Sequence, residues 1–379
     1  MDFSFSDEQE AVRSLARQIL ADHASHERFS ELEKDGVWFD SDLWSDLAAA
    51  GLTALLLPEE VGGGGCGIIE ACIVLEEAGR HLAHAPLLAT LLLAGAAIAE
   101  FGTPEQQRRW LTPVVTKAGV VTGALEETGN DSPERPGLQA IRDGSSWRLD
   151  GEKVCVPAAE LARCFVVPAR TDDSQVLVCL VDATGPGVSL ERQLTINREP
   201  HGRLTLDGAP VPAAAVLGDA SHGAGIVEWI ALRARLGLCA LQLGVAEEAL
   251  RRTAEYTRQR KQFDRPIASF QGVALRAADA YIDVACMRAT LDQAAWRVSA
   301  GLPAGAETAA AKWWACRGGQ RVVHTAQHLH GGIGSDVDYP IHRFFLWARQ
   351  AELSLGGASS QLARLGELLT TEMDEARPL

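Results

Sequence analysis

Three long helical segments toward the C-terminal end most constrain the fold of this chain. Apolar residues recur with the helical period over about 225–259, 268–300 and 304–329, and a shorter helix is predicted near 358–373. Helices longer than about 25 residues without coiled-coil heptads usually pack against one another. We therefore predict a C-terminal four-helix bundle.

The residues before the bundle divide into a helical part and a β-rich part. Residues 7–118 have the helical period, and Thr103 followed by Pro104 is a typical helix start. Over about 120–218, short runs of β-forming residues alternate with Gly, Pro and Asp. We predict an α+β fold with three domains: an N-terminal helical domain over 1–119, a middle β-domain over 120–220 and the bundle over 221–379.

Composition and charge exclude several classes of function. The 379 residues are 47% hydrophobic, which allows a large core, and the net charge of −15 disfavours nucleic-acid binding. The longest apolar stretch, 86–99, is too short to cross a bilayer and predicts a buried helix. The acidic N-terminus lacks the pattern of a secretion signal. We expect a cytoplasmic protein with no membrane partner.

Cysteine and histidine spacing gives little support for a metal site. The eight cysteines include no C-x-x-C pair, which favours reduced core thiols over a zinc or disulfide framework. His324 and His328 have the i,i+4 spacing of zinc ligands, and His330 lies nearby, but no Glu follows His324 to complete a zinc-protease motif. The glycines of 62–67 lack the preceding strand of a phosphate-binding loop, which favours a flexible connection.

The segment 251–265, RRTAEYTRQRKQFDR, is strongly basic within an acidic chain. One interpretation is a solvated helix end, where cations offset the negative pole of the helix dipole. The other is an anion site for a pyrophosphate, with Arg260 offering its forked set of donors. Charge alone leaves both open.

The chain resembles the acyl-CoA dehydrogenase family in five segments, in the family's order and approximate spacing. They are MDFSFSDEQEAVRSLAR, LPEEVGGGG, FGTPEQQRRWLTP, RQRKQFDRPIASFQ and QHLHGGIGSDVDYPIHR. The resemblance covers nearly the whole chain and implies the three domains given above. It also implies FAD held between two subunits: the β-domain of one subunit takes the flavin ring, and helices of its neighbour take the pyrophosphate and adenine end.

Six residues match the family's contacts with the neighbour's FAD, and we call them the partner-facing residues. They are Arg260, Phe263, Gln271, His328, Gly331 and Gly332. His328 stands where the family motif Q-L-H-G-G begins with Gln. Glycines at the end of this motif allow the backbone to approach a cofactor closely. The resemblance therefore favours the anion-site interpretation of the basic segment.

The positions that would hold the flavin ring, which we call the ring-side positions, differ from the family pattern. Where the family has L-T-E-P and K-x-W-I-T-N, this chain has 125–128, LEET, and 153–158, KVCVPA. Cys155 replaces an aromatic cover, and Glu126 and Pro157 replace two hydroxyl donors. Proline donates no hydrogen bond, and a carboxylate opposes the negative charge of reduced flavin. We predict weak flavin binding by this chain's own β-domain.

The catalytic base of the family is absent from its expected positions. In many members a Glu precedes a Gly in the loop before the last helix, where this chain has Leu355. In others the Glu lies on the first bundle helix, where this chain has Ala234 or Leu241. The neighbouring acids are Glu228, Glu247 and Glu248, and Arg235 matches an arginine that the family keeps near its acyl-CoA pocket.

The resemblance leads to one main hypothesis and two alternatives. The main hypothesis is a non-catalytic subunit of a heterotetrameric (α2β2) acyl-CoA dehydrogenase, similar to actinobacterial enzymes of steroid side-chain β-oxidation. Its partners would be a paralogous catalytic subunit, an acyl-CoA substrate and an acceptor such as electron-transfer flavoprotein. The alternatives are a homotetrameric dehydrogenase with a displaced base, and a non-redox acyl-CoA-binding or scaffold protein.

Overall fold

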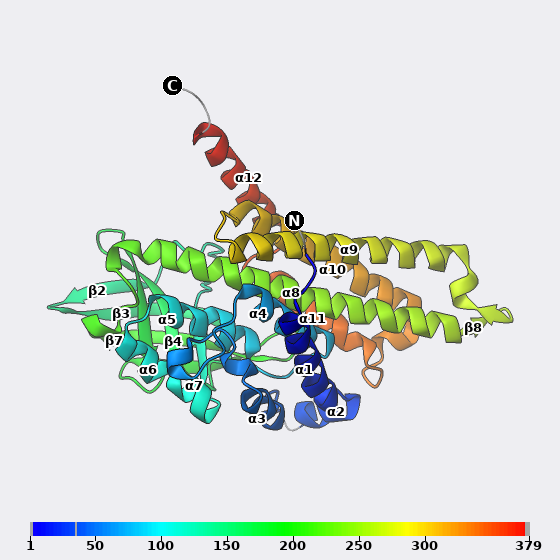
Figure 1. Ribbon diagram of the computed structural model, residues 1–379, viewed down its shortest axis with the longest axis horizontal. Helices are drawn as coiled ribbons and strands as arrows, with labels where there is room; N and C mark the ends of the chain where they lie inside the picture. Colours follow the sequence, from blue (N-terminus) through cyan, green and yellow to red (C-terminus); the bar gives the residue numbers. More distant parts are fainter. Residues whose placement is uncertain (1–2, 35, 376–379) are drawn as a thin grey trace. The chain divides into compact units, whose positions relative to one another are not determined.

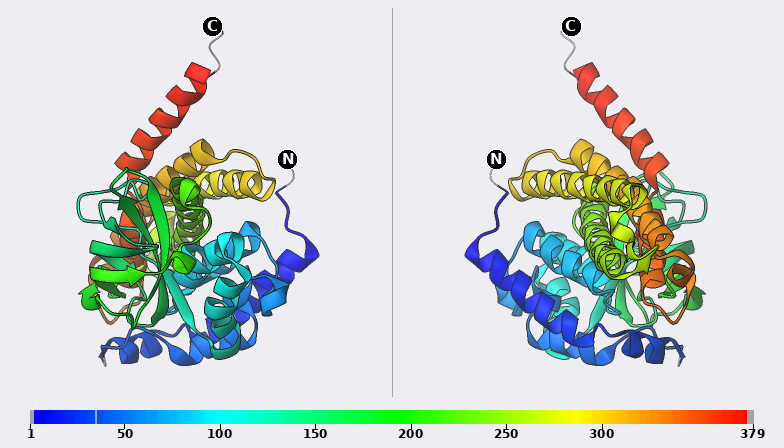
Figure 2. Two further views of the ribbon diagram at one scale, coloured as in Figure 1. Left: turned by 90° about the vertical axis from the view of Figure 1, so that its left-hand side faces the viewer. Right: turned by 90° about the vertical axis from the view of Figure 1, so that its right-hand side faces the viewer.

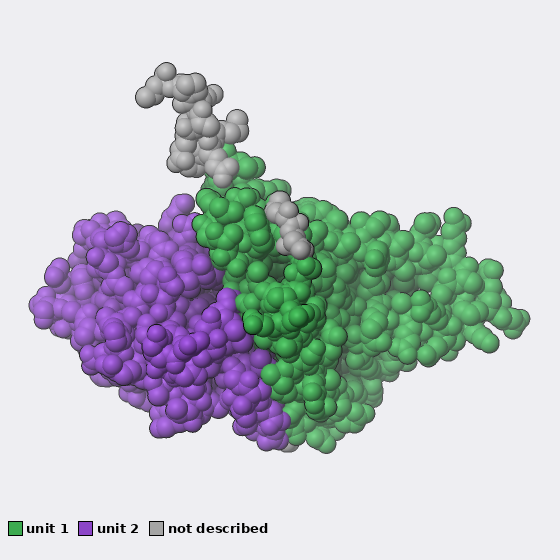
Figure 3. All heavy atoms as spheres, viewed as in Figure 1, with its two compact units in different colours: residues 1–34, 68–83, 235–379 green, residues 35–67, 84–234 purple. Residues whose placement is uncertain are grey.

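The computed structural model describes residues 3–34 and 36–375, which fall into two compact units (Figures 1 and 3). One unit contains Met1–Lys34, Ile68–Ala83 and Arg235–Leu379, and the other contains Asp35–Gly67 and His84–Ala234. The first is helical, and the second combines a sheet with short helices, which confirms the α+β class. Residues 1 and 2 of the first family-like segment lie outside the described residues.

The helical unit is built around the long helices that the sequence predicts. Its helices are α1 (Asp7–His23), α2 (His26–Lys34), α4 (Ile68–Arg80), the C-terminal part of α8 (Gly223–Gln259), α9 (Gln271–Ser299), α10 (Gly305–His330), α11 (Ile341–Leu353) and α12 (Ala358–Glu375). A two-stranded hairpin, β8 (Lys261–Gln262) and β9 (Arg265–Pro266), joins α8 to α9. In Figure 1, α8 and α9 run together toward this hairpin.

Close backbone contact and a partly buried ion network fix α4 against α8. A Cβ atom on Gly79 would lie 1.9 Å from the carbonyl oxygen of Leu241, so glycine is required at this crossing. Beside it, Arg80 contacts Glu247 at 2.6 Å, and Arg288 of α9 contacts the same carboxylate at 2.6 Å. These contacts join three helices of the unit through one acidic side chain.

The second unit holds a seven-stranded sheet, whose strands lie together in Figure 2. Its strands are β1 (Val120–Gly123), β2 (Gln139–Asp143), β3 (Ser146–Pro157), β4 (Ala162–Thr171), β5 (Val176–Asp182), β6 (Val188–Leu194) and β7 (Pro200–Val211). The order is β1-β4-β2-β3-β7-β6, and β5 pairs with β4. Pro157, His201 and Gln193 are cross-strand partners on β3, β7 and β6. This row lies at the ring-side positions.

The short helices of this unit include one whose start the sequence predicts. They are α3 (Ser41–Ala49), α5 (Ala96–Phe101), α6 (Pro104–Trp110) and α7 (Thr112–Lys117). Thr103 caps α6, since its hydroxyl accepts from the backbone N–H of Gln106 at 3.2 Å. The apolar stretch 86–99 is largely buried as predicted, although part of it, Ala89–Gly95, is π-helical.

The interpretation of 62–67 as a flexible connection is wrong. The backbone N–H groups of Gly63, Gly64 and Gly65 donate to Pro58, Ala54 and Leu57 at 2.9–3.1 Å. A Cβ atom on Gly63 would lie 2.2 Å from the carbonyl oxygen of Leu57. The glycines therefore serve a hydrogen-bonded loop in which two stretches of backbone touch.

Within the described ranges, no helix combines the length and hydropathy needed to span a membrane.

Candidate functional site

The hairpin between α8 and α9 presents two of the partner-facing residues to solvent. Arg260 follows the last residue of α8, and its backbone carbonyl accepts from the N–H of Ile267 at 2.8 Å, which closes the base of the hairpin. Phe263 at the tip is 88% exposed and has a φ of +51°. Left-handed backbone costs such a residue about 1–2 kcal/mol. A strained, exposed phenylalanine is typical of a contact that another molecule completes.

Aromatic stacking places the C-terminal end of α10 beside the C-terminal end of α8, which leads into the hairpin. The ring of Tyr256 on α8 stacks on His330 with centroids 4.3 Å apart, and its hydroxyl donates to the His330 carbonyl at 3.3 Å. The segment after His330 is a 3-10 turn, Gly331–Ser335. The structure thus gathers the residues near 260 with those near 331.

The gathered residues form a surface that is open toward solvent. Arg260, Gln271 and His328 are exposed, as are Gly331 and Gly332. Gly331 has a φ of +67°, and a Cβ atom on either glycine would meet no atom within 4 Å. Among the described residues, the guanidinium of Arg260 has no carboxylate partner. Exposed backbone and a free guanidinium suit the pyrophosphate end of a dinucleotide.

A groove between α9 and α10 continues this surface and holds residues that sequence reasoning missed. It encloses about 640 Å³ and is lined by Arg276, Asp279, Ala280, Ile282, Asp283, Arg321, His324, Thr325 and His328. Arg321 pairs with Asp283 through its Nε at 2.8 Å. His324 and Arg276 share the groove with His328. The i,i+4 spacing of His324 and His328 is the one sequence feature that could have pointed to this groove.

The three histidines of α10 do not act together. His324 and His328 line the groove, whereas His330 is buried and its Nδ1 lies 2.7 Å from the carbonyl oxygen of Ala326. Burial lowers the pKa of His330. In the described part of the chain, no three His, Cys, Asp or Glu side chains are placed to hold a metal ion.

At the ring-side positions, the carboxylate of Glu127 is bonded to neighbouring groups of the same unit. Its carboxylate accepts from Lys153 Nζ at 2.6 Å and from the backbone N–H groups of Gly137 and Leu138 at 2.6 and 3.1 Å. Burial alone would raise the pKa of Glu127, but the charge of Lys153 and these hydrogen bonds outweigh it and lower the pKa. The neighbouring Glu126 is half-buried.

Cys155 and Pro157 lie where β3 departs from regular geometry. The register between β3 and β7 shifts between Lys153 and Val156, and Cys155 has a φ of +50°. The N–H of Cys155 donates to Oε1 of Gln193 at 2.8 Å. Ala158, after Pro157, also has a left-handed φ of +52°. This backbone offers neither the aromatic face nor the hydroxyl donors of the family pattern.

The two sets of residues differ in how well they fit FAD. The partner-facing residues offer exposed donors and open backbone, so they fit the pyrophosphate and adenine end. The ring-side residues offer a carboxylate, a thiol and a proline where the family has hydroxyl donors and an aromatic cover, so they do not fit the flavin ring.

The position expected for the catalytic base is held in a constrained loop. Leu355 is buried, with a φ of +53°. Its carbonyl accepts from Arg235 Nε at 3.4 Å and from Gln361 Nε2 at 3.0 Å. Lys312 donates from Nζ to the carbonyl of Ala351 at 2.7 Å, near the C-terminal end of α11. The loop is anchored from three helices but carries no carboxylate at 355.

The other expected base positions and nearby acids supply no free carboxylate. Ala234 is fully buried, and the Leu241 carbonyl packs on Gly79. Burial would raise the pKa of Glu247, yet the charges of Arg288 and Arg80 lower it. Glu248 is likewise paired with two arginines, and burial is outweighed by Arg251 and Arg252, which lower its pKa. Glu228 is exposed on α8.

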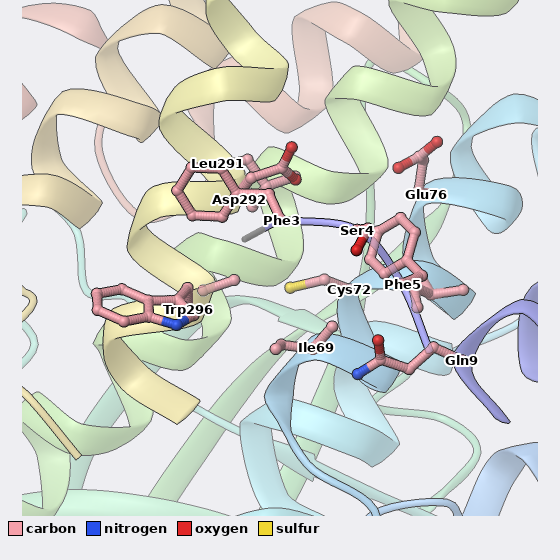
Figure 4. Close-up of a pocket in the computed structure, with 12 residues that line it drawn as sticks. Phe3, Ser4, Phe5, Gln9, Ile69, Cys72, Glu76, Leu291, Asp292 and Trp296 are labelled. Carbon is pink, nitrogen blue, oxygen red and sulfur yellow. The ribbon is translucent and has the colours of Figure 1, made fainter. Parts of the chain in front are cut away.

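A separate small cavity lies in the helical unit, beneath the segment that precedes α1. Figure 4 shows Phe3 and Phe5 close to Cys72, Asp292 and Trp296. Its volume of about 60 Å³ holds a few water molecules, too little for a flavin or a thioester. Burial raises the pKa of Asp292 to about 6. The cavity is therefore not a cofactor or substrate site.

The fold is that of a flavoprotein oxidoreductase, and comparison with known proteins gives the family. Residues 6–118 match the acyl-CoA dehydrogenase N-terminal domain, and residues 221–369 match the acyl-CoA dehydrogenase C-terminal domain. The chain is 41% identical to acyl-CoA dehydrogenase FadE27 of Mycobacterium tuberculosis over 97% of this chain and 99% of that protein. The chain belongs to the acyl-CoA dehydrogenase family, whose members are FAD-dependent.

Two solved structures of heteromeric complexes share the fold. The ChsE4-ChsE5 complex from Mycobacterium tuberculosis contains a chain 41% identical to this one, with a TM-score of 0.92 and full coverage of both chains. The Tcur3481-Tcur3483 steroid ACAD G363A variant contains a chain 46% identical, with a TM-score of 0.91, over 97% of this chain and 99% of that one.

Proposed function

We propose that this chain is the non-catalytic subunit of a heterotetrameric, FAD-dependent acyl-CoA dehydrogenase. In this assembly it supplies the partner-facing residues to FAD, and a paralogous subunit supplies the flavin-ring pocket and the base. The reaction is α,β-desaturation of an acyl-CoA thioester, and its electrons pass to an acceptor such as electron-transfer flavoprotein.

The observation that carries this proposal is the contrast between the two halves of the FAD site on one chain. The backbone of 331–332 is open to a ligand, and Arg260 is exposed beside it, whereas the ring-side positions have Glu126, Cys155 and Pro157 in place of the family's hydroxyl donors and aromatic cover. A homotetramer would need both halves in every chain. A chain with only the partner-facing half of the FAD site can function in an assembly with a second chain that has the flavin-ring half.

The cofactor contacts follow from the chemistry of the exposed groups. Arg260 would hold the pyrophosphate, Phe263 and Gln271 would flank it, and the backbone of 331–332 with His328 would contact the adenine end. When bound, FAD accepts the hydride that leaves the β-carbon of the substrate. This chain's part is to bind and orient the cofactor rather than to react with the substrate.

The absence of a catalytic base also supports a non-catalytic role for this chain. A positioned carboxylate contributes about 10²- to 10⁴-fold to proton removal next to a thioester. Leu355 offers none, and Glu247 and Glu248 are neutralised by arginines. Among the acids considered for the displaced-base alternative, Glu247 and Glu248 are therefore unsuited to accept the substrate proton.

Exposed apolar side chains on two helices supply a surface for the paralogous subunit. On α9, Leu275, Tyr281 and Ile282 are 57–68% exposed, and on α12, Leu362 and Leu369 are 58% and 46% exposed. Such side chains gathered on helices are typical of subunit interfaces. The two similar structures are the ChsE4-ChsE5 complex and the Tcur3481-Tcur3483 steroid ACAD, so each pairs two differently named chains and one is a steroid enzyme. We propose a steroid side-chain thioester as the substrate class.

Co-expression with a paralogous acyl-CoA dehydrogenase chain from the same organism tests the proposal. The expected result is a complex with equal amounts of the two chains that oxidises an acyl-CoA, whereas this chain alone shows no turnover. A homotetramer of this chain with turnover would exclude the non-catalytic role. A complex that binds acyl-CoA but never contains flavin would favour the scaffold alternative.

A further inference from the structure

The small cavity beneath the segment that precedes α1 is lined by aromatic rings and carboxylates. Its lining side chains come from that segment, from α1, from α4 and from α9, and Figure 4 shows them around one space. Phe3, Phe5 and Trp296 contribute three rings, and Glu76 and Asp292 contribute two carboxylates. The family contacts with FAD and the proposed reaction use none of these residues. The cavity therefore has a composition that the proposed function does not explain.

The two carboxylates of the cavity differ in their partners. Glu76 contacts Arg80 at 3.0 Å and Arg288 at 2.8 Å, so two guanidinium groups balance its charge. Asp292 is half-buried, and among the described residues its carboxylate makes neither a hydrogen bond nor an ion pair. Asp292 is therefore the group in this cavity that a bound cation would satisfy.

The charges on the surrounding helices leave Asp292 without compensation. Burial raises the pKa of Asp292 to about 6. Arg288 on α9 and Arg13 on α1 lower this pKa, whereas Glu76 on α4 and Glu247 on α8 raise it. Both arginines already contact other carboxylates, at 2.8 and 3.1 Å. Asp292 is thus mostly ionised at neutral pH, in a place where its charge is costly without a partner.

The lining of the cavity favours an organic ammonium ion over a metal ion. Hard metal ions take six or more oxygen ligands, and in the described part of the chain no three acidic, His or Cys side chains are placed to hold one. An ammonium group is satisfied by one carboxylate and is attracted to aromatic faces. The volume of about 60 Å³ suits about three non-hydrogen atoms, since a cavity of about 150 Å³ holds benzene.

We propose that this cavity binds a small primary alkylammonium ion, with the ammonium group on Asp292 and the alkyl group against Phe3 and Trp296. The ammonium N–H groups donate to the carboxylate, and no covalent bond changes. Phe3 and Ser4 are exposed, so the ion reaches the cavity from solvent on this side. A ligand of about three heavy atoms binds at best with a dissociation constant of about 1 mM. The site therefore responds to millimolar amine.

The test measures the dissociation constant of ethylammonium for the full chain, in its complex or alone. Saturation-transfer NMR of the ligand at neutral pH and constant ionic strength supplies it, and we expect about 1–10 mM. Asp292→Asn should raise the constant about ten-fold or more. Asp22→Asn removes an exposed carboxylate of α1 and should leave it unchanged. Absence of saturable binding, or equal binding by wild type and Asp292→Asn, would overturn the proposal.

Ligand size and pH provide two further comparisons. Tetraethylammonium is too large for the cavity and should not displace ethylammonium; displacement would place the binding elsewhere and overturn the proposal. Lowering the pH from about 8 to about 5 should weaken binding about ten-fold, because Asp292 becomes protonated while the amine keeps its charge. A dissociation constant that does not change with pH would also overturn it. The readout requires no flavin and no turnover, so its failure would leave the proposed function untouched.

Discussion

The Nε atom of Arg235 lies 3.4 Å from the carbonyl oxygen of Leu355, so a buried arginine of α8 holds the backbone where the family base is expected. The amide of Gln361 donates to the same oxygen at 3.0 Å. The loop keeps a fixed geometry although its side chain has no acid. Position 355 therefore lacks the catalytic carboxylate because its side chain differs, while the backbone conformation of the loop is held in place.

Restoring a carboxylate at this position should not restore activity to the chain alone. Leu355→Glu supplies the base, but the ring-side residues still do not fit a flavin. We expect no acyl-CoA oxidation by the Leu355→Glu chain, measured with an artificial electron acceptor and added FAD. Turnover by this single variant without a partner would show that the ring-side positions bind flavin after all.

Arg260→Ala should weaken FAD binding in the mixed complex without dissociating it. A hydrogen bond to a charged group contributes about 1.5–3 kcal/mol, so we expect the dissociation constant of FAD to rise about 10- to 100-fold. Titration of the flavin-free complex with FAD measures it. Arg258→Ala removes an exposed arginine two residues earlier and is the matched control. Equal effects of both variants would mean that only general charge matters.

Lys153→Met should destabilise the sheet unit strongly. Lys153 is fully buried, and removing one partner of a buried ion pair costs about 3–5 kcal/mol because Glu127 is left without its cation. Urea denaturation followed by tryptophan fluorescence reports the change. Arg203→Met breaks a solvent-exposed pair with Glu191 and should cost only about 0–1 kcal/mol. Similar losses for the two variants would contradict a structural role for Lys153.

The stabilisation by the His201–Glu199 pair should depend on pH. The pKa of His201 is about 10 in the folded chain and ordinarily 6.5, so the stabilisation is fully present below about pH 6.5 and is lost as the pH rises to 10. Wild type should exceed Glu199→Gln in unfolding free energy by about 1–3 kcal/mol near pH 6.5 and by little above pH 10. Urea midpoints of both proteins at several pH values measure this difference. A gap that is constant with pH would exclude the ion pair.

Sequence periodicity was sufficient for the long helices but not for their packing. Helices predicted over 268–300 and 304–329 are Gln271–Ser299 and Gly305–His330 in the structure. The helix Ile341–Leu353 was missed, and most of its inward residues are polar or aromatic, including His342 and Arg343. The glycine loop was misjudged because backbone approach to Leu57 depends on residues that pack only in the folded chain.

Only part of the candidate site was predictable, because local motifs are visible in the sequence and packing between helices is not. Arg260 and Gly331 stand in motifs, so their positions follow from the sequence. The groove residues Arg276 and His324 belong to two helices whose relative rotation no local pattern reveals. The partner of Lys153, by contrast, lies 26 residues away across the sheet unit, and only the fold identifies Glu127 as a structural anion.

The flavin content per chain tests the central claim most directly. This chain is purified alone and again after co-expression with its paralogue, and visible flavin absorbance is divided by chain concentration. We expect no flavin in the chain alone and about half a FAD per chain in the complex, because one of the two symmetry-related kinds of site is lost. One FAD per chain in the protein purified alone would contradict the account.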